Sequence, residues 1–308
     1  EALGALLSYV PEKCQDIYED SIKMILTAAS DSNIGLCSIG LKALINVIKI
    51  NQGQLPIDFS TAAIQAATNA MKLKIPEGDV HIEDDSCYSI EEIIVLGLKL
   101  LFFLLKYCEE SCRKIESGLP TLIESSFTSK PIIQIAAMKA AAYYIIKFNP
   151  EQTNVYDYLF NNIVQSKDNE IVIASFNTFK KLLWKSKSRL LIPNLERFTM
   201  ASLACLAHQL PFQEGSFEYI ENVSEMLSNF IESIIILQTH TFPGQKFIET
   251  VSAVIENVSI KESFAILDVL ATFIKYDGFV TNEILSFALN KLQLCDFSHG
   301  PEPIIFIH

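Results

Sequence analysis

The chain has 308 residues, of which half are hydrophobic and only 19% are charged. This composition supplies ample apolar side chains for a core, and it excludes a chain that is disordered over most of its length. The formal net charge of −12 argues against direct binding of nucleic acid, because an acidic surface repels a phosphate backbone. Acidity of this kind fits a basic protein partner and fits solubility alone equally well.

The first half of the chain shows apolar residues at helical spacing. Residues 1–10 resemble the second helix of a pair whose first helix is missing, so we expect the chain to be an excerpt of a longer array. Helices are predicted at 14–29 and 34–50, with a turn of Ser, Asp and Asn between them. A third helix runs to about Lys74, and its alanine-rich face permits close approach of a neighbouring helix.

The next segment departs from this pattern. Residues 75–88 are rich in carboxylates and contain a proline and a glycine, so this segment cannot bury itself. We expect it to be an acidic insertion within one repeat, not a boundary between domains. Its acidic residues, which could steer a Lys/Arg-rich partner or simply form a solvated loop, are Glu77, Asp79, Glu83, Asp84 and Asp85.

A repeated unit follows the acidic segment. Ser89 and Glu92 form a capping-box pattern for a helix to about Cys108, and a shorter helix ends near Thr128. The layout of residues 130–138 recurs at 168–176, which is 38 positions later. Expected helices at 132–148, 155–164 and 171–185 complete this unit, and further helix pairs are expected as far as residue 294. The most apolar run, residues 93–105, is about 13 residues long and contains Lys99, so it is shorter than the roughly 20 residues that a membrane span needs, and we expect a buried helix there.

A repeat of about this length, made of paired helices, defines the predicted fold class. We expect an all-α protein: an α-solenoid (superhelix) of HEAT- or armadillo-like antiparallel helix pairs that forms a single array over residues 1–308. Each unit of such an array contacts mainly its neighbours.

The sequence contains no convincing catalytic set. There is no glycine-rich phosphate loop and no GxSxG elbow, and Cys295 with His299 lacks the further ligands that zinc requires. We therefore predict no enzyme activity, no cofactor and no metal. The seven cysteines fall mostly on apolar helix faces, which favours buried thiols in a reducing, intracellular compartment. Cys108 and Cys112 lie one helical turn apart, and for them too buried thiols are favoured over a metal site or a disulfide.

Large aromatic residues occur on the helices of adjacent units, and most of them are expected in the core: Phe102, Phe103, Tyr143, Tyr144 and Trp184. Trp184 is the candidate for a partner contact, since grooves between solenoid helices accept aromatic side chains. Five basic residues surround it (Lys180, Lys181, Lys185, Lys187 and Arg189), although cations at a helix C-terminus also stabilise the helix dipole.

Short motifs resemble the HEAT repeats of the importin-β (karyopherin) family. They are Asp31, Asn33, Leu36, Ser38 and residues 40–44, together with residues 1–6 and 11–12. The basic residue that such repeats often carry early in the second helix is missing, because Gly35, Gln134 and Val172 stand at that position. The resemblance implies a nuclear transport receptor that binds basic cargo, a small GTPase or nucleoporins. It also implies the cytoplasm or the nucleus, or both, as the compartment.

By this resemblance, the five carboxylates of the acidic segment would bind the cargo or the GTPase. The alternative is a structural HEAT-repeat scaffold subunit of a cytoskeletal, chromosome-associated or kinase assembly, with no transport role. Both readings predict protein partners and no direct contact with nucleic acid, and neither fixes the oligomeric state.

Overall fold

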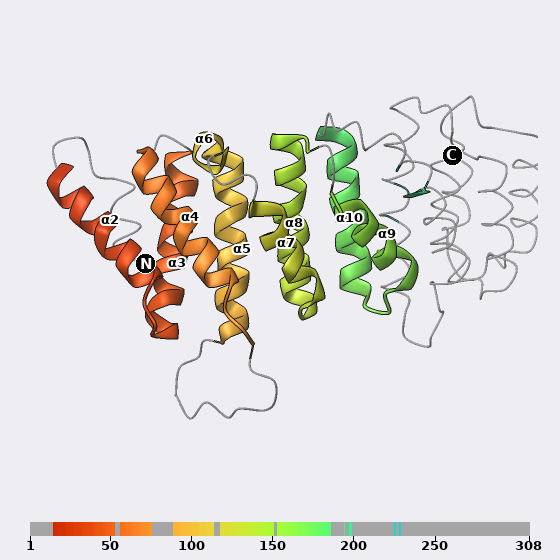
Figure 1. Ribbon diagram of the computed structural model, residues 1–308, viewed down its shortest axis with the longest axis horizontal. Helices are drawn as coiled ribbons and strands as arrows, with labels where there is room; N and C mark the ends of the chain where they lie inside the picture. Colours follow the sequence, from red (N-terminus) through yellow and green to blue (C-terminus); the bar gives the residue numbers. More distant parts are fainter. Residues whose placement is uncertain are drawn as a thin grey trace, which may run out of the picture. The chain divides into compact units, whose positions relative to one another are not determined.

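The computed structural model describes residues 15–52, 56–75, 89–113, 118–150 and 153–185, together with a few single residues farther along the chain. Every regular element within these ranges is a helix (Figure 1), so the all-α prediction is confirmed for them. The chain divides between Val155 and Tyr156 into two compact units, which we describe separately. The helices expected beyond residue 190 lie outside the described residues.

The helices match the expected ones closely. In the first unit they are α2 (Gln15–Ala29), α3 (Ile34–Asn51), α4 (Ile57–Met71), α5 (Ile90–Tyr107), α6 (Glu109–Arg113), α7 (Leu119–Glu124), the 3₁₀ helix η3 (Ser125–Thr128) and α8 (Pro131–Phe148). Two more follow, α9 (Val155–Gln165) and α10 (Asn169–Lys185). The short helix α6 is the one element of these ranges that the periodicity did not predict.

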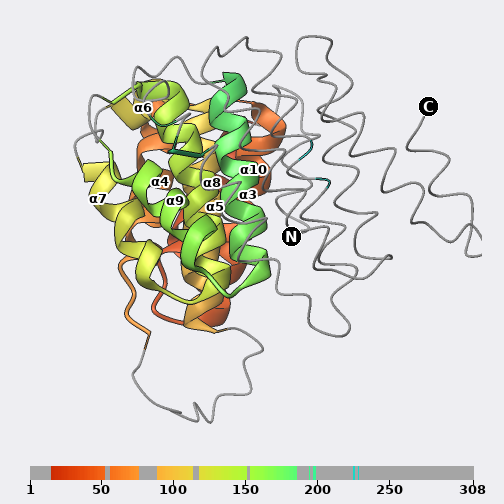
Figure 2. The same cartoon turned by 90° about the vertical axis from the view of Figure 1, so that its right-hand side faces the viewer.

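The first unit consists of two helix layers. Helices α3, α5 and α8 pack side by side in that order, and α2, α4 and α7 pack against α3, α5 and α8 respectively. Figure 1 shows this succession, and Figure 2 shows the two layers from the end. The short helix α6 closes the end of α5 and also contacts α4. Each helix therefore contacts near neighbours in the sequence, as the repeat predicts.

Polar side chains cap the N-termini of α3, α5 and α10. The side-chain oxygen of Asn33 accepts a hydrogen bond from the Leu36 amide at 3.1 Å, and that of Ser89 accepts one from the Glu92 amide at 3.2 Å. Asp168 caps α10 in the same way, whereas α8 begins with Pro131. Because these caps satisfy amides that a helix leaves unpaired, they fix where each helix begins.

Two glycines allow the helices to approach closely. A Cβ atom on Gly40 would lie 2.2 Å from the backbone nitrogen of Ala29, so α3 touches the backbone at the end of α2. A Cβ on Gly97 would lie 2.8 Å from the Cβ of Ala70 and 3.0 Å from the carbonyl oxygen of Ala67. The alanine-rich face of α4 therefore packs tightly on α5, as its small side chains predicted.

The acidic segment connects two helices that pack against each other. Helix α4 ends at Met71 and α5 begins at Ile90, and the residues between them include 76–88, which lie outside the described residues. The interpretation of 75–88 as an insertion within one repeat remains a prediction.

Aromatic packing stabilises the described part of the second unit. The Tyr156 ring in α9 meets the Phe179 ring in α10 edge to face, with centroids 6.3 Å apart. Phe179 also stacks on Phe198, and both side chains are fully buried. The Arg197 guanidinium lies 2.6 Å from a carboxylate oxygen of Asp157.

Among the described helices, α3 is long and apolar enough to cross a membrane by length and composition. Half of it is buried within the protein, where it packs against α2 and α5, and it carries Lys42 and Lys49. The core helix of a globular layer has the same properties, and we interpret α3 as such a helix.

Candidate functional site

The predicted site residues fall in both units. Glu77, Asp79, Glu83, Asp84 and Asp85 all lie outside the described residues. Trp184 lies in the last turn of α10 with 48% of its surface exposed, while the preceding Leu182 and Leu183 are buried. An exposed indole beside Lys185 fits a partner contact, and the assignment of Trp184 to partner binding stays a prediction.

A second surface emerges on the layer of α3, α5 and α8. Each of these helices carries two lysines at corresponding positions: Lys42 and Lys49, Lys99 and Lys106, and Lys139 and Lys147. The two lysines of a helix are seven or eight residues apart, which is about 10–12 Å along the axis. All six side chains are exposed or half-buried. The lysines thus form two rows that cross the three helices.

Aromatic rings lie between these rows and join the helices into one surface. The Lys49 ammonium of α3 lies 4.7 Å from the centroid of the Phe103 ring of α5. The Phe102 ring of α5 meets the Tyr143 ring of α8 edge to face, with centroids 4.7 Å apart. We call the six lysines with Phe102, Phe103, Tyr107 and Tyr143 the lysine–aromatic surface.

Lys106 is held by the neighbouring phenol. Its ammonium lies 4.6 Å from the centroid of the Tyr107 ring, which is nearly parallel to the Phe103 ring. A hydrogen bond with Tyr107 is the main cause that raises the pKa of Lys106 above its usual value, and Tyr143 of the next helix adds a smaller effect in the same direction. Lys106 therefore keeps its positive charge throughout the physiological pH range.

Two carboxylates at the N-terminal end of α5 pair with lysines of both neighbouring helices. The Lys42 ammonium of α3 pairs with Glu92 of α5 at 2.8 Å, and Lys130 at the start of α8 pairs with Glu91. These two acidic residues lie in the first turn of α5, where they also complement the helix dipole.

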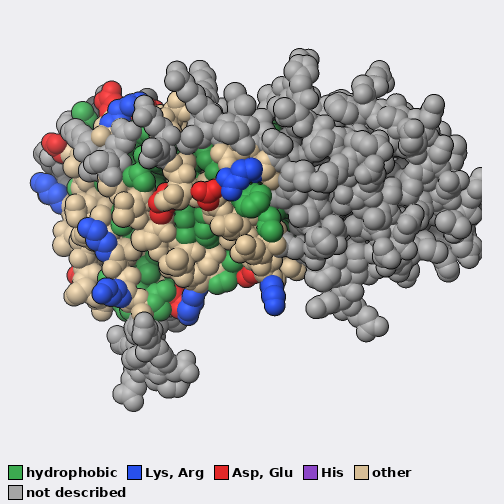
Figure 3. Space-filling model, turned by 45° about the vertical axis from the view of Figure 1, so that its right-hand side comes forward, with side chains coloured by type: hydrophobic (Ala, Val, Ile, Leu, Met, Phe, Trp, Pro, Cys, Tyr) green, Lys and Arg blue, Asp and Glu red, His purple; other side chains and the backbone are tan. Residues whose placement is uncertain are grey.

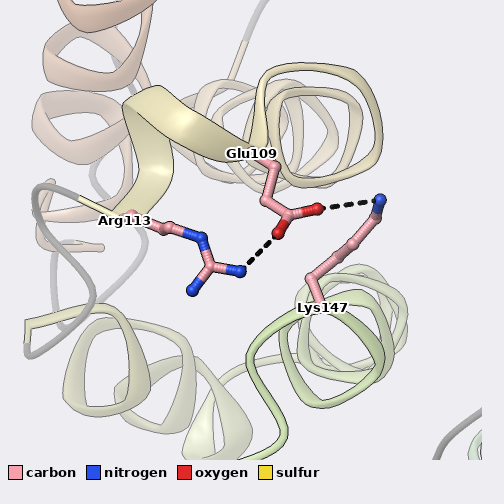
Figure 4. A network of polar contacts seen from close by, with 3 residues as sticks. All are labelled: Glu109, Arg113 and Lys147. Carbon is pink, nitrogen blue, oxygen red and sulfur yellow. Dashed lines mark hydrogen bonds and ion pairs between the residues drawn. The ribbon is translucent and has the colours of Figure 1, made fainter.

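A three-residue network binds the end of α8 to α6. One oxygen of Glu109 lies 2.5 Å from the Arg113 guanidinium and the other lies 3.2 Å from the Lys147 ammonium (Figure 4). The hydrogen bond from Arg113, and secondarily that from Lys147, lower the pKa of the Glu109 carboxyl despite its partial burial. Glu109 therefore offsets the charge of Lys147.

The other four lysines of this surface have no carboxylate partner in the described ranges. Within the described ranges, Lys99 and Lys139 make no ion pair, and Lys49 and Lys106 contact aromatic rings. The opposite layer carries a mixture of charges. On the side that includes α4 and α7, Figure 3 shows charged side chains of both signs among hydrophobic ones. The lysine–aromatic surface is thus a positive region on a chain with a net charge of −12.

The expectation of a core position holds for only some of the aromatic residues. Tyr144 is 4% exposed and belongs to the core. Phe102, Phe103 and Tyr143 are half-buried, and Trp184 is exposed. The signal that could have found the surface is the recurrence of lysine at the same position in each second helix.

The described cysteines are free and buried, which confirms the expectation for Cys37, Cys108 and Cys112. Burial raises the pKa of Cys112 to about 12, with the nearby Cys108 and Glu109 adding to the effect. Within the described residues, no group of three or more His, Cys, Asp or Glu side chains could hold a metal ion.

Comparisons with known proteins agree with this architecture. No protein-family model matches the chain, and no curated protein matches it significantly. Among solved structures, the chain is similar to Kap121p, with 15% sequence identity and a TM-score of 0.51 over 95% of this chain and 29% of that chain. A mutant of Kap121p aligns over 99% of this chain and 34% of its own, with 13% identity and a TM-score of 0.42.

Kap121p is a HEAT-repeat protein of the importin-β (karyopherin) type. The likeness shows the fold, so the predicted class is confirmed: the chain is an all-α, HEAT-like α-solenoid with an importin-like fold. The chain spans less than a third of the length of Kap121p, to which it is similar.

Proposed function

We propose that the chain is a non-enzymatic, protein-binding part of a nuclear transport receptor of the importin-β type. The observation that carries this proposal is the likeness of fold to Kap121p over 95% of the chain. The net charge of −12 and the acidic segment between α4 and α5 support it, since both suit partners with basic signals. Such a receptor works in the cytoplasm, the nucleus or both.

In this proposal, the acidic segment attracts the basic partner. Glu77, Asp79, Glu83, Asp84 and Asp85 place five carboxylates within nine residues, and such a density raises the association rate by steering. Trp184 supplies a separate apolar contact, because about half of its indole is exposed at the end of α10.

A peptide-binding assay tests the role of the acidic segment. The chain is titrated into a labelled basic signal peptide, and fluorescence anisotropy gives the affinity. Neutralising all five carboxylates to the corresponding amides should weaken binding at least tenfold, and full binding by this variant would remove the segment from the proposal.

A matched pair of triple variants separates local from general electrostatics. One variant neutralises Glu83, Asp84 and Asp85 of the acidic segment. The other neutralises three exposed carboxylates of α2, α4 and α6, namely Asp20, Asp58 and Glu110. Both change the net charge by the same amount. The first should weaken the binding of the basic peptide, whereas the second should leave it nearly unchanged.

The second candidate function is a structural scaffold for a cytoskeletal, chromosome-associated or kinase assembly. The low sequence identity to Kap121p favours this candidate, because a likeness at this level shows a shared fold and not a shared function. A pull-down with the GTP-loaded transport GTPase and with phenylalanine-glycine nucleoporin repeats distinguishes the two. A transport receptor should retain at least one of them, and a scaffold should retain neither.

A further inference from the structure

We propose that the lysine–aromatic surface of α3, α5 and α8 binds an acidic, extended segment of a partner protein. The surface consists of other residues than the acidic segment and Trp184, and its inferred ligand has the opposite charge to the basic cargo considered above. The inference therefore goes beyond the proposed function and does not depend on it.

The spacing of the lysines suits an extended peptide. Neighbouring helices pack with their axes about 8–10 Å apart, so successive lysines of a row are about that far from each other. A polyproline II chain, an extended form with three residues per turn, rises about 3.1 Å per residue, so its side chains at every third position share one face about 9 Å apart. Carboxylates three residues apart would then meet available lysines of neighbouring helices.

Four of the six ammonium groups are available to such carboxylates. Lys99 and Lys139 are exposed and make no ion pair within the described ranges. Lys49 and Lys106 contact rings, and a cation–π contact at an exposed site is weak. It leaves the ammonium able to pair with a carboxylate in addition to the ring.

The aromatic rings provide the apolar part of the surface. Phe102, Phe103 and Tyr143 are half-buried and contact one another across α5 and α8, so their exposed parts are fixed in place. Apolar side chains between the carboxylates of the partner would gain by covering these rings. The expected ligand is therefore acidic with interspersed apolar residues.

Helix stability alone does not account for the lysines. Lys49, Lys106 and Lys147 lie in last turns, where a cation complements the helix dipole. Lys99 and Lys139 lie in the middle of their helices, where the dipole contributes little. The mid-helix row is the part of the pattern that points to a ligand.

A protein ligand fits the surface better than a nucleic acid. The net charge of −12 opposes the approach of a long phosphate backbone. Single-stranded nucleic acid gains affinity by stacking bases on free aromatic faces, yet ammonium groups of the chain lie over the rings of Phe103 and Tyr107.

The test measures binding of a labelled 12-residue peptide with glutamate at every third position and leucine and serine between, using the 308-residue chain. A control peptide carries glutamine in place of glutamate. We expect saturable binding of the first peptide that weakens as salt is raised, and no binding of the second. Equal binding of both peptides, or of neither, overturns the proposal.

Two double variants locate the site. Lys99→Gln with Lys139→Gln should weaken binding at least tenfold without loss of the folded state, because neither side chain makes an ion pair within the described ranges. Lys72→Gln with Lys167→Gln removes two exposed lysines elsewhere and should change binding less than twofold. Equal effects of the two variants would contradict a local site.

Two further ligands distinguish other anions from an acidic peptide. A single-stranded oligonucleotide and vesicles rich in phosphatidylserine are titrated under the same conditions. Tighter binding of either one, sensitive to the Lys99 and Lys139 substitutions, would assign the surface to nucleic acid or to membrane and overturn the peptide proposal. The assay with the basic signal peptide is independent of these results, so the two proposals can fail separately.

Discussion

Helix α5 uses charge differently in its first turn and farther along its length. In the first turn, Glu91 and Glu92 pair with lysines from both neighbouring helices, so these charges hold the helices together. Farther along α5, Lys106 contacts an aromatic ring and Lys99 makes no ion pair in the described part of the chain. Charge in the first turn of α5 therefore supports the fold, whereas its two lysines remain available for a partner.

The close packing of the helices holds these charged side chains in place, and Gly40→Ala should disturb that packing most strongly. The added methyl group would meet the backbone of Ala28 and Ala29 at 2.2–2.6 Å, which flexible side chains cannot relieve. We expect a loss of about 3 kcal/mol or more in the free energy of unfolding, at or above the upper range for overpacking. Urea denaturation followed by circular dichroism measures it.

Gly97→Ala is the matched control for this substitution. Its methyl group would meet the Cβ of Ala70 at 2.8 Å and the carbonyl oxygen of Ala67 at 3.0 Å, which are longer distances than those at Gly40. We expect a smaller loss of about 1–2 kcal/mol, because a smaller shift of the helices relieves the overlap. A Gly97 variant that is less stable than the Gly40 variant would contradict the assigned packing.

A smaller effect distinguishes a paired lysine from an unpaired one at the corresponding position of the next helix. Lys42→Gln should lower the free energy of unfolding by up to about 1 kcal/mol through loss of the pair with Glu92. Lys99→Gln should leave stability within about 0.5 kcal/mol, since an exposed lysine without a partner contributes little. Denaturation of both variants measures the difference, and equal losses would contradict the distinction between the paired and the unpaired lysine.

The Glu109 network adds a pH dependence. Because its neighbours lower the pKa of Glu109 in the folded state, its contribution is present above the ordinary carboxyl value of 4.5 and is lost as the pH falls through the lowered pKa. Glu109→Gln should flatten this part of the stability profile by a few tenths of a kcal/mol, given the partial exposure of the site. Denaturation of both proteins between pH 7 and about pH 3 measures it, and identical profiles would contradict the network.

The smallest expected effect is an absence of reaction at Cys112. Its pKa of about 12 leaves almost no thiolate at pH 8, and its side chain is fully buried. Iodoacetamide should label Cys112 in denaturant but not in the native protein, as measured by mass spectrometry of peptides. Rapid native labelling would show that the end of α5 covered by α6 opens readily.

Periodicity and capping residues predicted most of the described fold. Ser89 and Asn33 mark helix starts by a chemistry that is local in the sequence, so their caps could be found without a structure. Helix α6 was missed because its five residues are too short to show a period.

The candidate surface could not be derived in the same way. Leu36 and Ile39 of α3 are more than 40% exposed although apolar residues surround them in the sequence, so the pattern does not reveal which side of the helix faces outward. Which lysines find a carboxylate depends on residues 38 or 39 positions away, as in Glu91–Lys130 and Glu109–Lys147. Such pairings are decided by packing between helices, which single-helix periodicity does not describe.

The ion pairs between residues about one repeat apart predict how the helices open and close in solution. Contacts that span about one repeat tie each helix mainly to its neighbours in the array, so one interface can open while others stay formed. Backbone amides of α5, which is packed on α3, α4 and α8, should then exchange their hydrogens with solvent more slowly than those of α2. The described helices of the first unit would then open one interface at a time, with α5 among the last.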